Sequence, residues 1–290
     1  MKNNPSLHFL FPAAVLLLLA VLIIWTLWGN TALMASSFTL ESDRVPTAFS
    51  GFRIAQISDL HNAEFGEGNT ELLRRLEENA PDIIVITGDL IDARRPNIET
   101  ALHFVRESVK LAPVYYVPGN HEARLPSYGV LRSGLKKAGA TVLENKALPL
   151  KRDGDKITLI GLSDPKFVKW KNATNADNAA IIRTPLKRLL PPDNAYSIVL
   201  SHRPEQFETY AACGADLVLT GHAHGGQFRF PFVGGLFAPN QGFFPKYDSG
   251  LYTEGKTNMI VSRGLGPSVI PIRFHNRPEL IIAELRHAGA

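Results

Sequence analysis

Cysteine is nearly absent from this sequence: Cys213 is the only one among 290 residues. A single cysteine excludes an internal disulfide framework and a cysteine-rich zinc module, and it leaves the redox compartment open. No Gly-x-Ser-x-Gly segment occurs, so a serine hydrolase of that type has no candidate nucleophile. The net charge is only +4 and is diffuse, which does not favour nucleic-acid binding.

The composition is otherwise that of a folded protein. Hydrophobic residues make up 45% of the chain and charged residues 20%, which excludes a disordered, collagen-like or coiled-coil chain. With 290 residues, the chain can bury the core of one large domain or of two small ones.

An uncharged apolar segment at residues 9–28 is the first distinct feature of the chain. As a helix, at about 1.5 Å per residue, it would span roughly 30 Å, the thickness of a bilayer's hydrocarbon core. Trp25 and Trp28 stand at its end, as interfacial anchors would. A cleaved signal peptide is the alternative, but its apolar region is usually only about 7–15 residues long. We therefore expect an uncleaved transmembrane anchor over residues 1–30. The flanking charges, Lys2 and Arg44, nearly balance and leave the membrane side of the domain open.

Residues 31–50 contain Ser, Thr and Pro without clear periodicity, and we expect them to be a linker. From residue 51 to residue 290 we expect one domain, in which short β-branched runs alternate with helical stretches. The predicted strands are residues 52–57, 83–87, 114–117, 157–161, 197–200, 217–220, 259–261 and 280–285. The predicted helices are residues 69–80, 98–111, 128–138, 179–190 and 205–211. This alternation predicts an α/β fold.

Candidate metal ligands follow five of the predicted strands. Ligands of an open α/β sheet gather at the carboxyl ends of strands, so segments that are distant in sequence can meet there. Carboxylate, amide and imidazole donors together suit Mn, Fe or Zn, whereas an all-oxygen set would favour Mg or Ca. The residues are Asp59, His61, Asp89, Asp92, Asn120, His121, Glu122, His202, His222 and His224.

Each of these elements alone has an ordinary explanation. Gly88-Asp89 and Gly119-Asn120 are common turn dipeptides, and an isolated histidine such as His202 is more often structural than a ligand. Five ligand-type clusters at five strand ends would then have to arise for unrelated reasons. Their joint occurrence indicates one metal site.

The ordered series Asp59-x-His61, Gly88-Asp89-x-x-Asp92, Gly119-Asn120-His121-Glu122, His202 and Gly221-His222-x-His224 resembles that of the calcineurin-like metallophosphoesterases. The resemblance covers residues 51–285. It implies a four-layer α/β/β/α sandwich with a centre of two divalent metal ions. Residues 224–227 and 261–266, together with the apolar amino-terminal segment, are similar to the membrane-anchored bacterial branch of that family. This similarity implies that the anchor lies in the bacterial inner membrane.

The resemblance also implies roles for the individual residues. One metal would be held by Asp59, His61 and His224, and the other by Asn120, His202 and His222, with Asp89 as the bridge. His121 would be catalytic, giving a proton or a hydrogen bond to the leaving oxygen. Asp92 would support the metal ligands by hydrogen bonding, and Glu122 would orient His121. A plain surface carboxylate is the alternative for Glu122.

For function, the resemblance implies hydrolysis of a phosphoester or pyrophosphate bond in a small molecule or a lipid-linked substrate. UDP-2,3-diacylglucosamine, an intermediate of lipid A synthesis, is the specific candidate. A general phosphodiesterase or protein phosphatase of the same chemistry, or a metal-free scaffold, is the alternative. We expect the membrane as a partner through the amino-terminal helix, and no nucleic acid.

Phenylalanine is concentrated in one stretch, since six of the sixteen lie within residues 227–247. One explanation is that these rings pack a long loop onto the sheet, as most aromatic side chains do. The other is an apolar surface near the metals that contacts an acyl chain or the bilayer.

Overall fold

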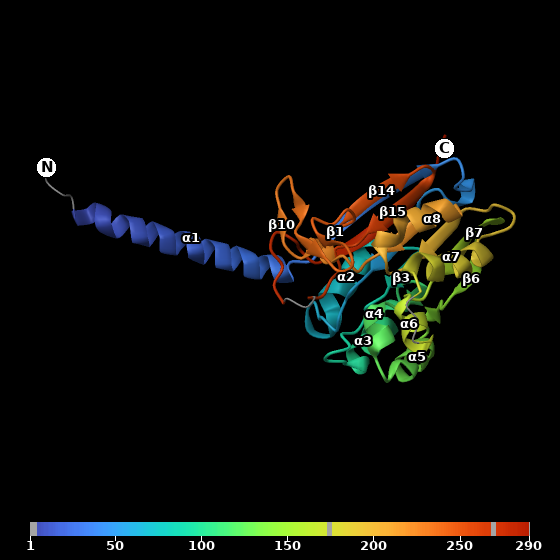
Figure 1. Ribbon diagram of the computed structural model, residues 1–290, viewed down its shortest axis with the longest axis horizontal. Coiled ribbons are helices and arrows are strands. Elements are labelled where there is room, and N and C mark those ends of the chain that lie inside the picture. Colours follow the sequence, from blue (N-terminus) through green and yellow to red (C-terminus); the bar gives the residue numbers. More distant parts are fainter. Residues whose placement is uncertain (1–4, 173–175, 268–270, 290) are drawn as a thin grey trace.

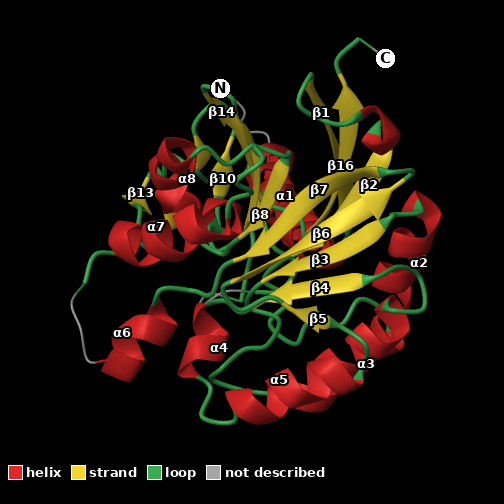
Figure 2. Cartoon of the chain, turned by 90° about the vertical axis from the view of Figure 1, so that its right-hand side faces the viewer, coloured by secondary structure: helices red, strands yellow, loops and turns green. Residues whose placement is uncertain are grey.

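The computed structural model describes residues 5–172, 176–267 and 271–289. Two six-stranded sheets face each other at the centre of the domain, with helices on the outside (Figure 2). The first sheet has the order β1 (Met34–Ser42), β16 (Glu279–His287), β2 (Phe52–Ile57), β3 (Ile83–Thr87), β4 (Val114–Val117) and β5 (Thr141–Val142). The second has the order β14 (Gly250–Glu254), β15 (Thr257–Val261), β9 (Leu217–Thr220), β8 (Ser197–Leu200), β7 (Asp155–Gly161) and β6 (Lys146–Arg152).

Helices cover the outer face of each sheet. The helices are α1 (Pro5–Thr31), α2 (Thr70–Asn79), α3 (Ile98–Ser108), α4 (Asn120–Arg124), α5 (Tyr128–Lys137), α6 (Lys166–Asn172), α7 (Asn178–Leu189) and α8 (Phe207–Cys213). Short elements are η1 (Thr47–Phe49), η2 (Glu67–Asn69), η3 (Pro204–Gln206), η4 (His224–Gly226), β10 (Arg229–Phe230), β11 (Gly234–Gly235), β12 (Phe237–Ala238) and β13 (Gly242–Phe243). Among the helices, α2, α3 and α5 pack on the first sheet, and α7 and α8 pack on the second.

Side-chain alternation along the strands creates three apolar layers. On β2, Ile54 faces the second sheet and packs near Ile198 and Leu219, whereas Ala55 and Ile57 face the outer helices. Successive residues of a strand point to opposite faces, so an apolar strand of this kind is buried on both sides. The predicted four-layer α/β/β/α sandwich is confirmed.

Parallel pairing brings the carboxyl ends of the central strands to one edge. Strands β2, β3, β4 and β5 are parallel in the first sheet, as are β7, β8, β9 and β15 in the second. The strands predicted at residues 52–57, 83–87, 114–117, 197–200 and 217–220 coincide with β2, β3, β4, β8 and β9. The loops that carry the candidate ligands therefore leave the two sheets at neighbouring positions.

The expected linker at residues 31–50 is a point of difference, because residues 34–42 form β1 instead. This strand pairs in parallel with β16, from Met34 opposite Glu279 to Ser42 opposite His287. The Ser36 hydroxyl also donates to the Glu279 carboxylate at 2.6 Å. Because the partner strand lies more than 200 residues further along the chain, the local pattern of β1 did not reveal the pairing. The folded domain thus begins at or before Met34.

Helix α1 extends away from the sandwich (Figure 1). By length and composition, the segment Phe11–Thr31 could cross a membrane, and none of its most apolar window is buried in the protein. Its last turn is bound to the domain, since the Asn30 amide donates to the Arg273 carbonyl at 2.8 Å and accepts the Arg273 N–H at 2.7 Å. The Arg277 guanidinium donates to the carbonyls of Ala32 and Leu33.

Candidate metal centre

The predicted ligands converge where strands of both sheets end. Asp59 follows β2, Asp89 follows β3, and Asn120 follows β4, while His202 and His222 follow β8 and β9 of the second sheet. All of the residues predicted as metal ligands are buried. Behind them, the Gln56 amide donates to the Thr87 hydroxyl at 3.0 Å and to the Thr220 carbonyl at 2.8 Å. The bond to Thr220 joins the first sheet to the second beneath the site, and the bond to Thr87 links β2 to β3 within the first sheet.

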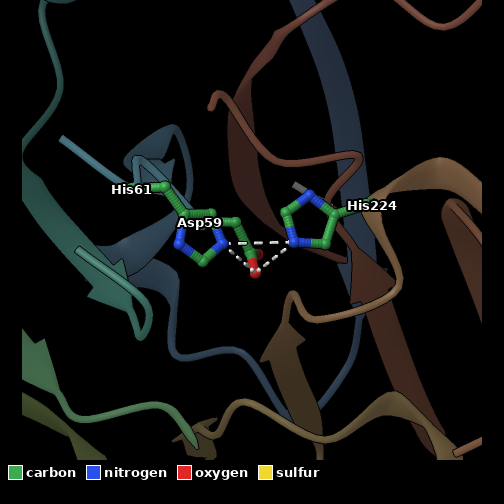
Figure 3. A group of neighbouring side chains, drawn as sticks. All are labelled: Asp59, His61 and His224. Carbon is green, nitrogen blue, oxygen red and sulfur yellow. Dashed lines mark hydrogen bonds and ion pairs between the residues drawn. The ribbon is translucent and has the colours of Figure 1, made fainter. Parts of the chain in front are cut away.

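One group of donors consists of Asp59, His61 and His224 (Figure 3). Asp59 Oδ1 lies 3.3 Å from His224 Nε2 and 3.9 Å from His61 Nε2. The two histidine Nε2 atoms are 3.2 Å apart. Three donor atoms therefore converge on one small volume. Two of them belong to Asp59 and His61, which are two residues apart on the loop after β2.

The backbone around Asp59 is shaped to present this carboxylate. Its Oδ2 atom accepts the Ser58 hydroxyl at 2.6 Å and the His222 N–H at 3.0 Å, so Oδ1 is left facing the site. Gly221 is required for the close approach, because a Cβ atom there would lie 2.2 Å from Asp59 Oδ2. This close contact explains why glycine, and no larger residue, stands immediately before His222.

A second group consists of Asp89, His202 and His222. Asp89 Oδ2 lies 3.3 Å from His202 Nε2 and 3.7 Å from His61 Nε2, so this carboxylate stands between the two groups. Its Oδ1 accepts the His121 N–H at 2.7 Å. On His202, Nδ1 lies 2.8 Å from the Thr87 carbonyl oxygen, which fixes the proton on Nδ1 and leaves Nε2 as the donor atom.

Four buried atoms of the predicted ligands have no hydrogen-bond partner among the described residues: Asp59 Oδ1, His61 Nδ1, Asn120 Oδ1 and His202 Nε2. The Asp59 and His202 atoms lie 3.9 Å apart. Buried polar atoms are nearly always paired, because an unpaired one loses its hydration without compensation. Unpaired oxygen and nitrogen atoms that converge are the arrangement that a divalent cation requires. The residues present therefore fit a metal centre of mixed carboxylate, amide and imidazole donors.

Burial controls the protonation of the histidines. It lowers the pKa of His61 to about 4 and holds the pKa values of His222 and His224 well below their usual range. These rings are neutral near pH 7, as metal ligands must be. For His202, burial also lowers the pKa, but the carboxylates of Asp89 and Asp59 outweigh it and raise the value to about 10. Without a cation, the two carboxylates therefore favour protonated His202, and a metal ion that binds Nε2 would take the place of this proton.

His121 lies at the edge of the site with its ring held from behind. Its Nδ1 atom accepts the Ala93 N–H at 3.1 Å and lies 3.2 Å from Asp92 Oδ1, while Nε2 is 4.0 Å from Asp89 Oδ2. Burial of Asp92 would raise its pKa, but hydrogen bonds from Arg94 outweigh this and lower it to about 2. Asp92 is therefore a carboxylate, and it contacts His121 as a supporting residue would.

Glu122 differs from the expectation. It is fully buried, and its carboxylate accepts the N–H groups of Asp89 and Gly119 at 2.8 Å each and that of Ile91 at 3.2 Å. It is neither a surface carboxylate nor bonded to the His121 ring. Helix α4 begins at Asn120, so Glu122 lies in its first turn and its side chain reaches back to the preceding loop amides. Glu122 therefore shapes the backbone that carries Asp89.

Several polar residues around the site were not predicted from the sequence. Arg203 is buried and paired with Asp164, and its Nη1 lies 2.8 Å from His222 Nε2 and 2.7 Å from Asn240 Oδ1. Arg273 Nη2 lies 3.4 Å from His224 Nδ1. Arginine is usually exposed, and Asn240 and Arg273 come from loops without a periodic pattern. Only the position of Arg203 directly after His202 offered a signal.

Comparisons with known proteins agree with this geometry. The family model for calcineurin-like phosphoesterases matches residues 52–226, which is more than half of the chain and includes all ten predicted site residues. This chain belongs to the calcineurin-like phosphoesterase family. It is 32% identical to the metallophosphoesterase YkuE of Bacillus subtilis over 86% of this chain and 84% of that one. It is 29% identical to the phosphodiesterase YaeI of Escherichia coli, over 81% of this chain and 82% of that one.

Membership of the calcineurin-like phosphoesterase family makes this protein a metal-dependent hydrolase of phosphate-containing substrates. Among solved structures, the protein TT1561 of Thermus thermophilus is similar with a TM-score of 0.50 and 14% identity, over 74% of this chain and 90% of that one. At this identity the likeness concerns the fold alone. The predicted family and enzyme class are both confirmed.

Proposed function

We propose that this calcineurin-like phosphoesterase is a membrane-anchored enzyme that uses two divalent metal ions to hydrolyse a phosphoester or pyrophosphate bond. The observation that carries the proposal is the set of buried, unpartnered donor atoms from both sheets, with Asp89 between them. A structural cluster would satisfy these atoms internally, because unpaired buried polar groups are costly.

Each metal has its own ligands in this proposal. Asp59, His61 and His224 would hold one ion, Asn120, His202 and His222 would hold the other, and Asp89 would be shared by both. The mixture of imidazole nitrogens with carboxylate and amide oxygens favours Mn, Fe or Zn. When bound, two such cations neutralise the negative charge that develops on a phosphoryl group during in-line displacement.

The chain's own residues then supply orientation and a proton. The Ala93 N–H at Nδ1 of His121 favours the neutral ring with its proton on Nε2, on the side of Asp89. From that position His121 donates to the oxygen of the leaving group. Asp92 Oδ1 lies 3.2 Å from Nδ1, so Asp92 packs against the neutral ring and hydrogen-bonds to it only when Nδ1 is protonated. Glu122 keeps the Asp89 loop in place through three backbone N–H groups.

A lipid-linked phosphate compound is the substrate class that we propose. Helix α1 is long and apolar enough to span a bilayer, and its last turn is hydrogen-bonded to Arg273, whose guanidinium lies against His224. A site tethered in this way is held near membrane lipids. UDP-2,3-diacylglucosamine is the specific candidate. A general phosphodiesterase is the alternative, and similarity to the phosphodiesterase YaeI favours it.

The test uses the full chain, purified in detergent and loaded with manganese. We expect about two metal ions per chain and turnover of the chromogenic diester bis(p-nitrophenyl) phosphate. A panel of acylated sugar nucleotides, phosphatidyl lipids, nucleotides and phosphopeptides then identifies the substrate class. Preference for the acylated sugar nucleotide supports the lipid A assignment, and equal rates across the panel support the general phosphodiesterase. Absence of both metal and turnover supports a scaffold.

A further inference from the structure

An apolar turn projects from the domain at the tip of a small hairpin. Strands β10 and β11 pair through Arg229 with Gly235 and Phe230 with Gly234. Residues 230–233 lead from the end of β10 to the start of β11, and we call this segment the phenylalanine turn. The side chains of Phe230, Phe232 and Val233 in this turn are all exposed, and Phe232 is completely so. Phe232 also has a φ of +67°, a left-handed conformation that is rare for a bulky residue.

The hairpin is fixed at its base, so the exposure of the turn is a property of the fold. The Arg229 guanidinium pairs with Asp248 at 2.9 Å, and the same carboxylate accepts the Gly235 N–H at 2.6 Å. The Arg229 N–H donates to the Phe274 carbonyl at 3.0 Å. These contacts hold the two strands and prevent the phenylalanine turn from folding back onto the sheet.

The same base connects the hairpin to α1. The Phe274 ring lies 6.1 Å from the Phe230 ring on one side and 5.6 Å from the Trp25 ring on the other. Residue 273, next to Phe274, makes the paired hydrogen bonds with Asn30 at the end of α1. Figure 1 shows β10 beside the end of α1 that meets the domain. The phenylalanine turn and the anchor are therefore held in one orientation.

We propose that the phenylalanine turn enters the lipid–water interface of the leaflet from which α1 emerges, so that the domain rests on the membrane surface. This rests on α1 spanning the membrane, as in the proposed function. Trp25 and Trp28 mark the depth of that interface, because tryptophan rings favour the headgroup level. The chain of rings from Trp25 through Phe274 brings Phe230 to the same depth. Arg277, which lies over the Trp28 ring at 4.8 Å, adds a cation where lipid headgroups are anionic.

A bilayer is the occupant that these contacts favour. A second copy of the chain or the acyl chain of a substrate could also cover exposed rings. Neither accounts for the continuity of the phenylalanine turn with the base of α1, a helix whose most apolar window is not buried against any described residue. Aromatic side chains beside a membrane span are typical of interfacial anchoring.

The test places an environment-sensitive NBD fluorophore on the full-length enzyme in vesicles of phosphatidylethanolamine and phosphatidylglycerol. Cys213→Ser removes the only native thiol, and Phe232→Cys gives the labelling position in the turn. Val130→Cys is the matched control, because Val130 is also an exposed apolar residue but lies on α5, away from α1 (Figure 1). Leu17→Cys within α1 is the reference for a membrane-embedded position. The quencher is a lipid that carries a nitroxide near the top of its acyl chain.

We expect label at position 232 to be quenched several-fold more strongly than label at position 130. Quenching at 17 with equal, weak quenching at 232 and 130 would overturn the inference and leave the anchor intact. No quenching at any position would overturn both. Hydrolysis of bis(p-nitrophenyl) phosphate by each labelled protein reports separately on the catalytic part of the proposed function. Blue-shifted NBD emission at position 232 without quenching by the nitroxide lipid would overturn the inference and indicate a second copy as the occupant.

A functional variant gives a second measurement. Phe232→Asp places a charge in the phenylalanine turn without disturbing the core, because the native side chain is fully exposed. We expect unchanged turnover of the soluble diester and a several-fold lower kcat/KM for an acylated phosphate substrate presented in vesicles. Val130→Asp should leave both rates unchanged. Equal effects of the two variants on the vesicle substrate would contradict membrane contact by the turn.

Discussion

The carboxylate of Glu122 accepts the backbone N–H of Asp89 at 2.8 Å, which binds the loop after β4 to the loop after β3. Two more amides, those of Gly119 and Ile91, donate to the same carboxylate. The residue that stands between the two donor groups is thus positioned through its backbone by a buried acid. Since the Glu122 side chain makes no bond to the His121 ring, changes at Glu122 act through the shape of this loop.

Replacing Glu122 with alanine leaves three buried N–H groups without their acceptor. Because each such group costs roughly 1–3 kcal/mol, we expect the free energy of unfolding to fall by about 3 kcal/mol or more. Urea unfolding of the detergent-solubilised chain measures the change. Glu122→Gln, which retains one acceptor oxygen, should lose less. The control is Glu107→Ala, whose carboxylate is exposed and pairs with Lys110, and which should change stability little. A loss at Glu122 no larger than at Glu107 would refute this role.

The sequence was sufficient to predict the strands that lead into the site and the polar residues that follow them. Strand β3 is a β-branched run buried at every position, and β4 is a short run of Val and Tyr, so composition alone marks both as strands. Asp89 and Asn120 follow them within three residues. Convergence of these loops follows from parallel pairing, a general property of α/β sheets. Asp92 was expected to support the site by hydrogen bonding, and the structure places it against His121.

Features that depend on distant pairing could not be predicted. Strand β1 is rich in serine, so its sequence does not mark it as a strand, and its extended conformation is held by pairing with β16. Glu122 lies three residues after the N-cap Gly119, a spacing that accounts for its bond to the Gly119 N–H, but its bonds to Asp89 and Ile91 depend on how the β3 loop packs against α4. Arg203 is buried because Asp164, from a loop some forty residues earlier, compensates its charge. In each case the deciding contact is far away in sequence or depends on backbone direction.

Asp89 and His121 should respond differently to substitution. In Asp89→Asn, loss of the carboxylate between the two donor groups should reduce metal content and abolish turnover. In His121→Ala, metal content should be retained, while kcat falls by about 100-fold or more because the proton donor is lost. Elemental analysis and hydrolysis of bis(p-nitrophenyl) phosphate measure both effects. Equal loss of metal in the two variants would contradict this division of roles.

The buried ion pair of Arg203 and Asp164 should show strong coupling. Arg203→Leu leaves the Asp164 carboxylate buried without its partner, and we expect a loss of about 3–5 kcal/mol of unfolding free energy. The double variant with Asp164→Leu should recover a large part of this loss, because neither charge is then buried alone. Urea unfolding of the four proteins completes the double-mutant cycle. The exposed pair Arg74 and Glu71 is the control and should show little coupling. Additive losses in the buried pair would contradict direct compensation.

Removal of metal should lower stability, since the buried carboxylates of Asp59 and Asp89 then face each other's charge without a divalent cation. Binding to the folded state alone stabilises it by about 2.7 kcal/mol per site at a free metal concentration about 100 times Kd. We therefore expect the unfolding midpoint of chelator-treated protein to rise on addition of Mn²⁺. Mg²⁺ at the same concentration should raise it less, because imidazole ligands disfavour magnesium. Asp89→Asn should show a smaller rise with Mn²⁺ than the native chain. An unfolding midpoint that is the same with and without Mn²⁺ in the native protein would mean that these donors do not form a metal site.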